Sequence, residues 1–188
     1  AIVARGASII DGDSTDGSGP DVRAAQVLLQ AAEQIGGAME AGGVAVGTAQ
    51  ALDIAADRLA AQSGFHLLVN EQDRLTLGAV SVSLARAGGG LSGAEFSLAG
   101  LASLGGGDIA LSAGSADLNG TLTLAQGSTV KTGGAGTISL AARGSDAQLV
   151  LQDDVISDRG RMDLAATLSV DKLDAVRLDS AGDIARFW

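Results

Sequence analysis

The chain has 188 residues and a formal net charge of −10, from 22 acidic against 12 basic side chains. Its field therefore repels phosphate backbones and anionic lipid, which argues against nucleic acid as a partner. Apolar residues make up 46% of the chain but aromatic residues only 2%, so the core must be built of Ala, Val, Ile and Leu, with 28 glycines between them.

The length fits a single domain, residues 1–188. No apolar run reaches the roughly 20 residues of a membrane-spanning helix, so membrane insertion is not expected. Without Cys the chain has neither disulfides nor thiolate metal sites, which leaves its redox compartment open. The chain does not begin with Met and stops abruptly at ARFW, and we expect it to be a piece of a much longer protein.

The stretch IIDGDSTDGSGPDV, residues 9–22, is the first candidate site. Asp11, Asp13 and Asp16 place carboxylates close together, as a Ca²⁺ loop does, and they are the only metal ligands that the sequence suggests. The EF-hand pattern needs Gly at the sixth place and Glu at the twelfth, and neither stands there. We favour a solvated loop that ends at Pro20, with a weak Ca²⁺ site as the alternative and no other cofactor.

Residues 21–40 fit two patterns. Ala24, Val27 and Ala31 recur at helical spacing in an Ala-rich run, which predicts a short helix. The same stretch also fits two strands with a slight offset, whose inward or near-inward residues are Val22, Ala24, Val27, Leu29 and Ala31. We favour the strands, and the helix over residues 21–40 remains the alternative.

A short motif recurs along the whole chain, and it decides the predicted fold. Its copies are AIVA at 1, DVRAA at 21, DIAA at 53, SVSLA at 81, DIALSA at 108, TISLAA at 137, DLAA at 163 and DIA at 183. Their starts lie about 26 residues apart on average, in the range of roughly 20 to 30 residues that is typical of solenoid repeats.

Within each interval aliphatic residues alternate at period two, as in Leu122 with Leu124 and Ile138 with Leu140, which predicts strands. Glycine-rich strings at 105–107, 119–120, 133–136 and 158–160 separate these strands and indicate corners. The pattern predicts an all-β chain wound as a parallel β-helix, or β-solenoid, with rungs of about 20–30 residues.

Candidate catalytic groups are few. His66 is the only histidine, and no serine stands in a nucleophile motif that would form a catalytic triad with it. The glycine-rich string GGGLSG at 88–93 lacks the Lys of a phosphate loop. We therefore assign no catalytic and no cofactor-binding residue. The alternative is a carbohydrate-active β-helix enzyme, a polysaccharide lyase or hydrolase, with a groove lined by Asp153, Asp154, Asp158, Arg159 and Arg161. We favour pairing of these charges across neighbouring rungs.

The runs GASIIDG at 6–12, DVRAAQVLLQAAEQIG at 21–36 and GGDIALSAGSADLNGTLTLAQGSTVKTGGAGTISLAARG at 106–144 resemble repeats of giant bacterial surface and secreted proteins of the filamentous-haemagglutinin-like kind. The resemblance implies a right-handed parallel β-helix, export from a Gram-negative cell and an extracellular or cell-surface location. It implies a structural or adhesive role, as rod, adhesin, matrix or filament component, with neighbouring repeats, further copies of the chain, or host and neighbouring-cell glycans and proteins as partners. A Ca²⁺-dependent adhesive module is a further alternative.

Overall fold

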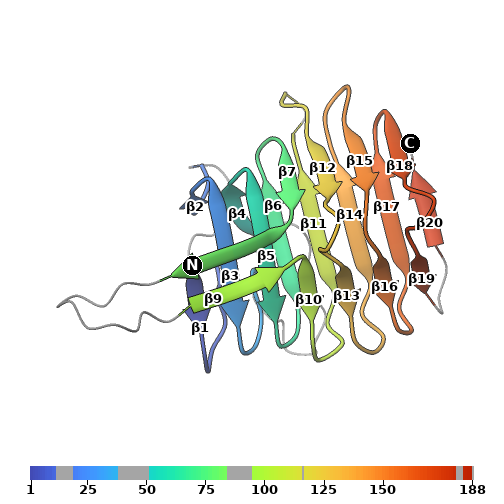
Figure 1. Ribbon diagram of the computed structural model, residues 1–188. Helices are drawn as coiled ribbons and strands as arrows, with labels where there is room; N and C mark the ends of the chain where they lie inside the picture. Colours follow the sequence, from blue (N-terminus) through green and yellow to red (C-terminus); the bar gives the residue numbers. More distant parts are fainter. Residues whose placement is uncertain (12–18, 38–50, 84–94, 116, 181–183, 188) are drawn as a thin grey trace.

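A computed structural model describes residues 1–11, 19–37, 51–83, 95–115, 117–180 and 184–187 of the chain (Figure 1). These residues form strands, bends and turns and contain no helix. The strands are arranged in three sheets of 11, 7 and 2 strands. Pairing in the two larger sheets is parallel, and pairing in the two-stranded sheet is antiparallel.

The strands of the two larger sheets are short. The 11-stranded sheet contains β1 (Ile2–Ala4), β3 (Gln26–Ala31), β5 (Arg58–Ser63), β7 (Leu75–Leu77), β10 (Leu101–Ser103), β12 (Thr121–Leu124), β13 (Val130–Thr132), β15 (Gln148–Leu151), β16 (Val155–Ser157), β18 (Ser169–Lys172) and β19 (Leu178–Ser180). The 7-stranded sheet contains β2 (Val22–Arg23), β4 (Leu52–Ala55), β6 (Leu67–Glu71), β11 (Ile109–Ala113), β14 (Ile138–Ala142), β17 (Met162–Ala166) and β20 (Ile184–Phe187).

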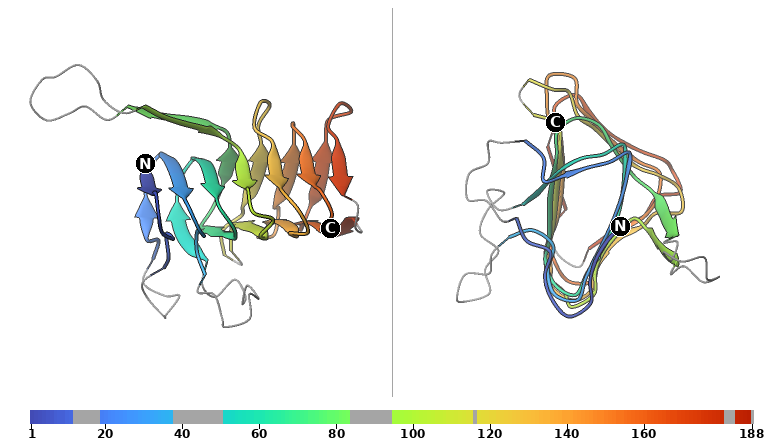
Figure 2. Two further views of the ribbon diagram at one scale, coloured as in Figure 1. Left: turned by 90° about the horizontal axis from the view of Figure 1, so that it is seen from below. Right: turned by 90° about the vertical axis from the view of Figure 1, so that its left-hand side faces the viewer.

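Along the chain, strands of the 11-stranded sheet alternate with strands of the 7-stranded sheet. We call each such group of consecutive strands a layer. The layers are β1 with β2, β3 with β4, β5 with β6, β7 with β10 and β11, β12 with β13 and β14, β15 with β16 and β17, and β18 with β19 and β20. Each strand pairs with its counterparts in the layers before and after it. Seen from the end, the paired strands superpose on one three-sided outline (Figure 2).

The register aligns like side chains from layer to layer. Leu67 pairs with Ile109, Ile109 with Ile138, and Ile138 with Met162, and all four side chains are buried. Alternate residues of each strand point inward, because neighbouring side chains of a strand lie on opposite faces. The inward aliphatic residues form one continuous core along the stack.

The 11-stranded sheet divides at β5. The first half of β5 pairs with β7, as Leu59 does with Leu77, and the second half pairs with β10, as Ala61 does with Leu101. Between β7 and β10 the chain leaves the layer as an antiparallel hairpin of β8 (Ala79–Ser83) and β9 (Glu95–Ala99). The layers of β3 and β5 have one strand of six residues on this side, and the layers after them have two shorter strands with a corner between them.

The hairpin covers the outer face of β3 and β5 (Figure 1). Leu28 and Ala60 point away from the main core, yet both are fully buried, because Val80 of the hairpin packs against them. Val82, Phe96 and Leu98 complete this second, smaller core. The hairpin therefore buries an outward-facing apolar patch that the layers themselves leave uncovered.

Two sequence expectations and one alternative need correction. Residues 21–37 form β2, β3 and bends, so the helix over residues 21–40 is wrong for its described part, and 38–40 lie outside the described residues. Ala24, expected to point inward, is exposed. The motif copy at Ser81 lies in the hairpin strand β8, so this part of the chain does not form a layer.

Candidate functional site

A ladder of buried hydroxyl groups runs along one corner of the stack. It contains four hydroxyls: Ser103, Thr132 and Ser157 are 1%, 2% and 1% exposed at the ends of β10, β13 and β16, and Ser180 is half-buried at the end of β19. Each hydroxyl donates a hydrogen bond to a carbonyl of the previous layer: Ser103 to Phe65, Thr132 to Gly107 at 2.8 Å, Ser157 to Gly136 at 2.9 Å and Ser180 to Gly160. The ladder therefore joins five successive layers from inside, where an unpaired carbonyl would be costly.

The carbonyls of this ladder belong mostly to stacked glycines. A Cβ on Gly136 would lie 2.3 Å from the carbonyl oxygen of Gly107, and a Cβ on Gly160 would lie 1.9 Å from that of Gly136. Both distances are far below van der Waals contact, so no side chain fits between these layers. Glycine is required here by the close approach of two backbones.

Aspartates bind the corners of neighbouring layers from outside. Asp153 accepts hydrogen bonds from the N–H groups of Gly127 at 2.5 Å and Ser128 at 3.3 Å, and from the hydroxyl of Thr129 at 3.0 Å. Asp154 accepts from the N–H of Arg177 at 2.7 Å. These two carboxylates, proposed from sequence as groove residues of an enzyme, thus bind corner backbone in the layers before and after their own.

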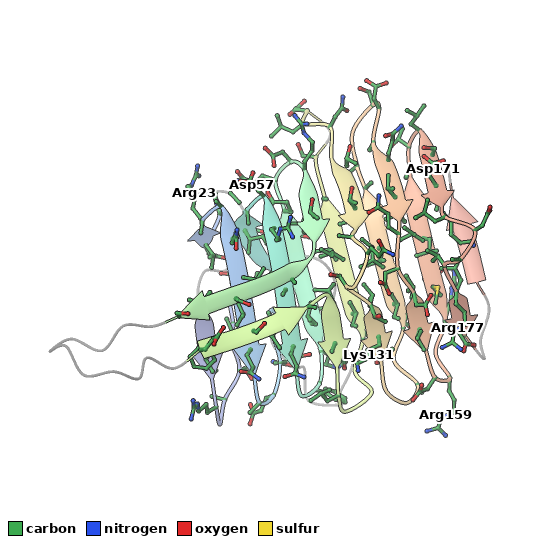
Figure 3. The ribbon with its side chains drawn as sticks, in the orientation of Figure 1. Arg23, Asp57, Lys131, Arg159, Asp171 and Arg177 are labelled. Atoms are coloured by element: carbon green, nitrogen blue, oxygen red, sulfur yellow. The ribbon has the colours of Figure 1, made fainter. Side chains whose placement is uncertain are left out.

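The other charges of that sequence cluster have separate partners. Asp158 accepts a hydrogen bond from the N–H of Gly134 at 3.2 Å, one layer back. Arg161 pairs within its own layer with Asp163 at 2.6 Å. Arg159 lies at the lower edge of the stack and points away from it (Figure 3). The cluster that looked compact in sequence is therefore distributed over several corners.

Hydrogen bonds to Asp153 favour its ionised form. Burial by itself would raise the pKa of this carboxyl, but the N–H groups of Asp154, Gly127 and Ser128 and the hydroxyl of Thr129 outweigh it and lower the pKa below its ordinary value of 3.8. Asp153 therefore stabilises the fold as a carboxylate.

His66 is 5% exposed and lies just before β6. Its Nδ1 accepts a hydrogen bond from the backbone N–H of Asp108 at 3.0 Å, so the ring proton lies on Nε2. Nε2 is buried and has no hydrogen-bond partner in the described part of the chain. The Asp108 carboxylate approaches Nδ1 only to 3.7 Å and accepts instead from the N–H of Thr137 at 2.7 Å.

A shallow trough lies on the outer face of β6, β11 and β14, with a volume of about 350 Å³. Its floor is formed by small outward-facing residues, among them Ala110, Ser139 and Ala141. Asp108 lies at one end of the strands and Arg143 at the other. The Arg143 side chain is exposed and makes no ion pair with another described residue. The volume falls within the range of small-ligand sites, about 300–1,000 Å³.

One wall of the trough is a polar ladder across three layers. The Asn70 amide donates to the Asp53 carboxylate at 3.2 Å, and the Ser112 hydroxyl donates to the Asn70 amide oxygen at 2.8 Å. The backbone groups of these strands bond to the neighbouring layers. A ligand in the trough would therefore be recognised by side chains, with Arg143 as cation, Asp108 as anion and Ser139 as hydroxyl.

Glu71 is the most unusual ionisable group in the described residues. It lies at the end of β6, is 2% exposed and points inward at a corner of the stack. Burial raises the pKa of its carboxyl to about 7, although hydrogen bonds from the N–H groups of Ala56, Asp73 and Gln72 oppose the shift. Sequence reasoning missed Glu71, and the only signal was an acidic residue ending the aliphatic run LLVNE.

The Ca²⁺ candidate lies mostly outside the described residues. Asp11 is half-buried, whereas Asp13 and Asp16 lie outside the described residues. In the ranges that are described, no three His, Asp or Glu side chains gather closely enough to hold a metal ion. The GGGLSG string at 88–93 also lies outside them. No described helix is long and apolar enough to cross a membrane.

No protein-family model, curated protein or solved structure matches the chain.

Proposed function

We propose that the chain is a right-handed parallel β-helix, a segment of a large exported bacterial surface or extracellular-filament protein. Its function is mechanical, to extend and space the parts of that protein and to present an adhesive surface. The hydroxyl ladder is the observation that carries the proposal, because it adds a second set of interlayer bonds to the parallel strand pairing. Right-handed connection is the usual form of parallel strand crossovers.

The stack suits a load along its axis. Each layer buries its aliphatic side chains only against its neighbours, so stability is close to a sum of interlayer terms. Strand hydrogen bonds, the hydroxyl ladder and the corner carboxylates all connect one layer to the next, as Asp153 does with Gly127. Separating two layers therefore breaks many bonds at once, whereas bending a connecting loop breaks few.

Single-molecule force spectroscopy tests this role. With the chain held at both ends, we expect successive ruptures that each release one layer, 22 to 29 residues where Ile109, Ile138, Met162 and Ile184 follow one another in register. Each step should lengthen the chain by roughly 70–100 Å at about 3.3–3.6 Å per residue. One rupture of the whole chain, at no greater force than a helical-bundle control, would contradict a load-bearing role.

The trough is our candidate for the adhesive surface, with a glycan or protein of a neighbouring cell as its ligand. The observation that favours it is Arg143, a cation without an ion pair among the described residues, beside a hollow of ligand size. Binding of the labelled chain to an array of neutral and anionic oligosaccharides tests it. We expect Arg143→Ala to weaken binding about tenfold and the exposed Arg159→Ala to leave it unchanged. Equal effects of both substitutions would argue against the trough.

The two alternatives from sequence have their own tests. A carbohydrate-active enzyme predicts activity on anionic glycans that is lost in the Asp153→Asn, Asp154→Asn double variant. A Ca²⁺-dependent module predicts that a chelator lowers the melting temperature, and that Asp13→Asn removes the effect. An unchanged melting temperature would leave the loop at residues 9–22 as a connection only.

A further inference from the structure

One inward position of the stack holds a carboxylate where neighbouring layers hold apolar side chains. In register, Glu71 pairs with Ile54 in the layer before and with Ala113 in the layer after. Ala142 and Ala166 continue the same column. The column is therefore apolar except at Glu71, and a side chain of alanine size is sufficient for the fold at this position.

The Glu71 carboxylate binds the backbone of two corners. Its Oε2 accepts a hydrogen bond from the N–H of Ala56 at 2.8 Å, in the corner that leads from β4 to β5. Its Oε1 accepts from the N–H groups of Gln72 at 2.9 Å and Asp73 at 3.4 Å, in the corner that leads from β6 to β7. These two corners are joined through one buried side chain.

The position of these corners gives the contact its importance. They lie where the number of strands in a layer changes. β5 is a single long strand, and in the next layer β7 and β10 together occupy the same side of the stack. The charged groups on the elements around Glu71 are Asp53 on β4, Asp57 and Arg58 before and in β5, Asp73 and Arg74 before β7, and Asp117 after β11. None of the four ion pairs in the described residues includes Glu71, so no described cation pairs directly with its carboxylate.

We propose that Glu71 makes this double corner a pH-sensitive joint, closed while its carboxyl is protonated and opening more often once it is ionised. Burial without a cation penalises the charge, and a transient opening that admits water relieves the penalty. Because burial raises the pKa of Glu71 to about 7, the change falls near neutral pH. The joint is a property of the fold and does not depend on the adhesive role.

The raised pKa of Glu71 fixes the direction in which folding stability changes with pH. The folded-state pKa lies above the ordinary value of 4.5, so the contribution of Glu71 to stability is fully present below pH 4.5 and is lost as pH rises through 7. The shift corresponds to a factor of roughly 300 in the folding equilibrium constant, tenfold for each pH unit. The corner amides of Ala56, Gln72 and Asp73 should lose protection over the same range.

The test compares the wild-type chain with Glu71→Gln, which keeps an acceptor oxygen without a charge. Two quantities are measured from pH 4.5 to 8.5: the folding equilibrium constant from urea unfolding, and hydrogen exchange of the Ala56, Gln72 and Asp73 amides, corrected for intrinsic exchange. We expect the equilibrium constant of the wild-type chain to fall at least a hundredfold relative to Glu71→Gln, with loss of protection only in the wild type. Glu95→Gln, on the exposed hairpin edge, is the matched control and should follow the wild type.

A second measurement, the titration of the Glu71 carboxyl in the wild-type chain, does not require the variant to fold. In carbon-13 NMR of the wild-type chain, the Glu71 carboxyl should titrate with a midpoint near 7. A midpoint near 4.5, or corner amides whose protection is the same at pH 5 and pH 8.5, would overturn the proposal. If Glu71→Gln does not fold, the NMR midpoint and the amide exchange of the wild-type chain decide the question.

Discussion

The hydroxyl of Ser157 donates a hydrogen bond to the carbonyl of Gly136 at 2.9 Å, across the boundary between two layers. The same hydroxyl accepts a hydrogen bond from the N–H of Gly160 in its own layer, also at 2.9 Å. One buried side chain thus closes a corner and joins it to the corner before it. Thr132 repeats the interlayer bond one layer earlier, to Gly107.

The hydroxyl ladder should contribute measurably to stability. Thr132→Val keeps the shape of the side chain but leaves the buried carbonyl of Gly107 without its donor. We expect a loss of about 1–3 kcal/mol in the free energy of unfolding, from urea denaturation. Ser139→Ala, on the outward face of β14, is the control and should change it by less than about 0.5 kcal/mol. Equal losses in both variants would show that the ladder is not a special contact.

The stacked glycines should tolerate no side chain. A Cβ on Gly136 meets the carbonyl oxygen of Gly107 at 2.3 Å, and backbone cannot move aside without parting the layers. We expect Gly136→Ala to cost about 3 kcal/mol or more. Gly6 has open space around it, so Gly6→Ala should be nearly neutral. Thermal unfolding of the two variants side by side distinguishes close backbone contact from a general effect of replacing glycine.

Asp153 should stabilise the fold at neutral pH and lose this effect in acid. Its folded-state pKa is lowered, so its contribution is present above the ordinary value of 3.8 and is lost as pH falls through the folded-state value. We expect Asp153→Asn to cost about 1–2 kcal/mol at pH 7 and progressively less below pH 4. The exposed Asp117→Asn is the control and should cost less than about 0.5 kcal/mol at pH 7. A constant difference between wild type and Asp153→Asn over this pH range would contradict the assignment.

The hairpin should be a fixed part of the domain. Leu28 points away from the main core but is completely buried by the hairpin. We therefore expect Leu28→Ala to cost about 2–5 kcal/mol, as for a core leucine. Leu104, 60% exposed at a corner, provides the matched control, and its replacement by Ala should cost less than about 0.5 kcal/mol. If Leu28→Ala proves equally mild, the hairpin does not cover β3 in solution.

The sequence alone predicted an all-β chain of short strands, because alternation at period two is a local property, and the recurring motif predicted their parallel pairing. Leu122 with Leu124 and Ile138 with Leu140 alternate in β12 and β14 as expected, and all four are buried. Glycine corners were also predicted correctly: Gly106 and Gly134 have φ angles of 81° and 80°, which favour glycine over other residues. Five motif copies, at 21, 53, 108, 137 and 163, fall in or immediately before strands of the 7-stranded sheet.

Only the tertiary structure decided which strand lies beside which. The copy at Ser81 has the same alternation as the others, yet β8 leaves the stack as part of a hairpin, since pairing with β9 buries Val80 against Leu28. β6 belongs to the 7-stranded sheet although no motif copy marks it. The burial of Glu71 and the bonds of Asp153 and Ser157 join residues about 15 to 26 positions apart. Such contacts depend on the combined length of all the intervening loops, which no local sequence pattern determines.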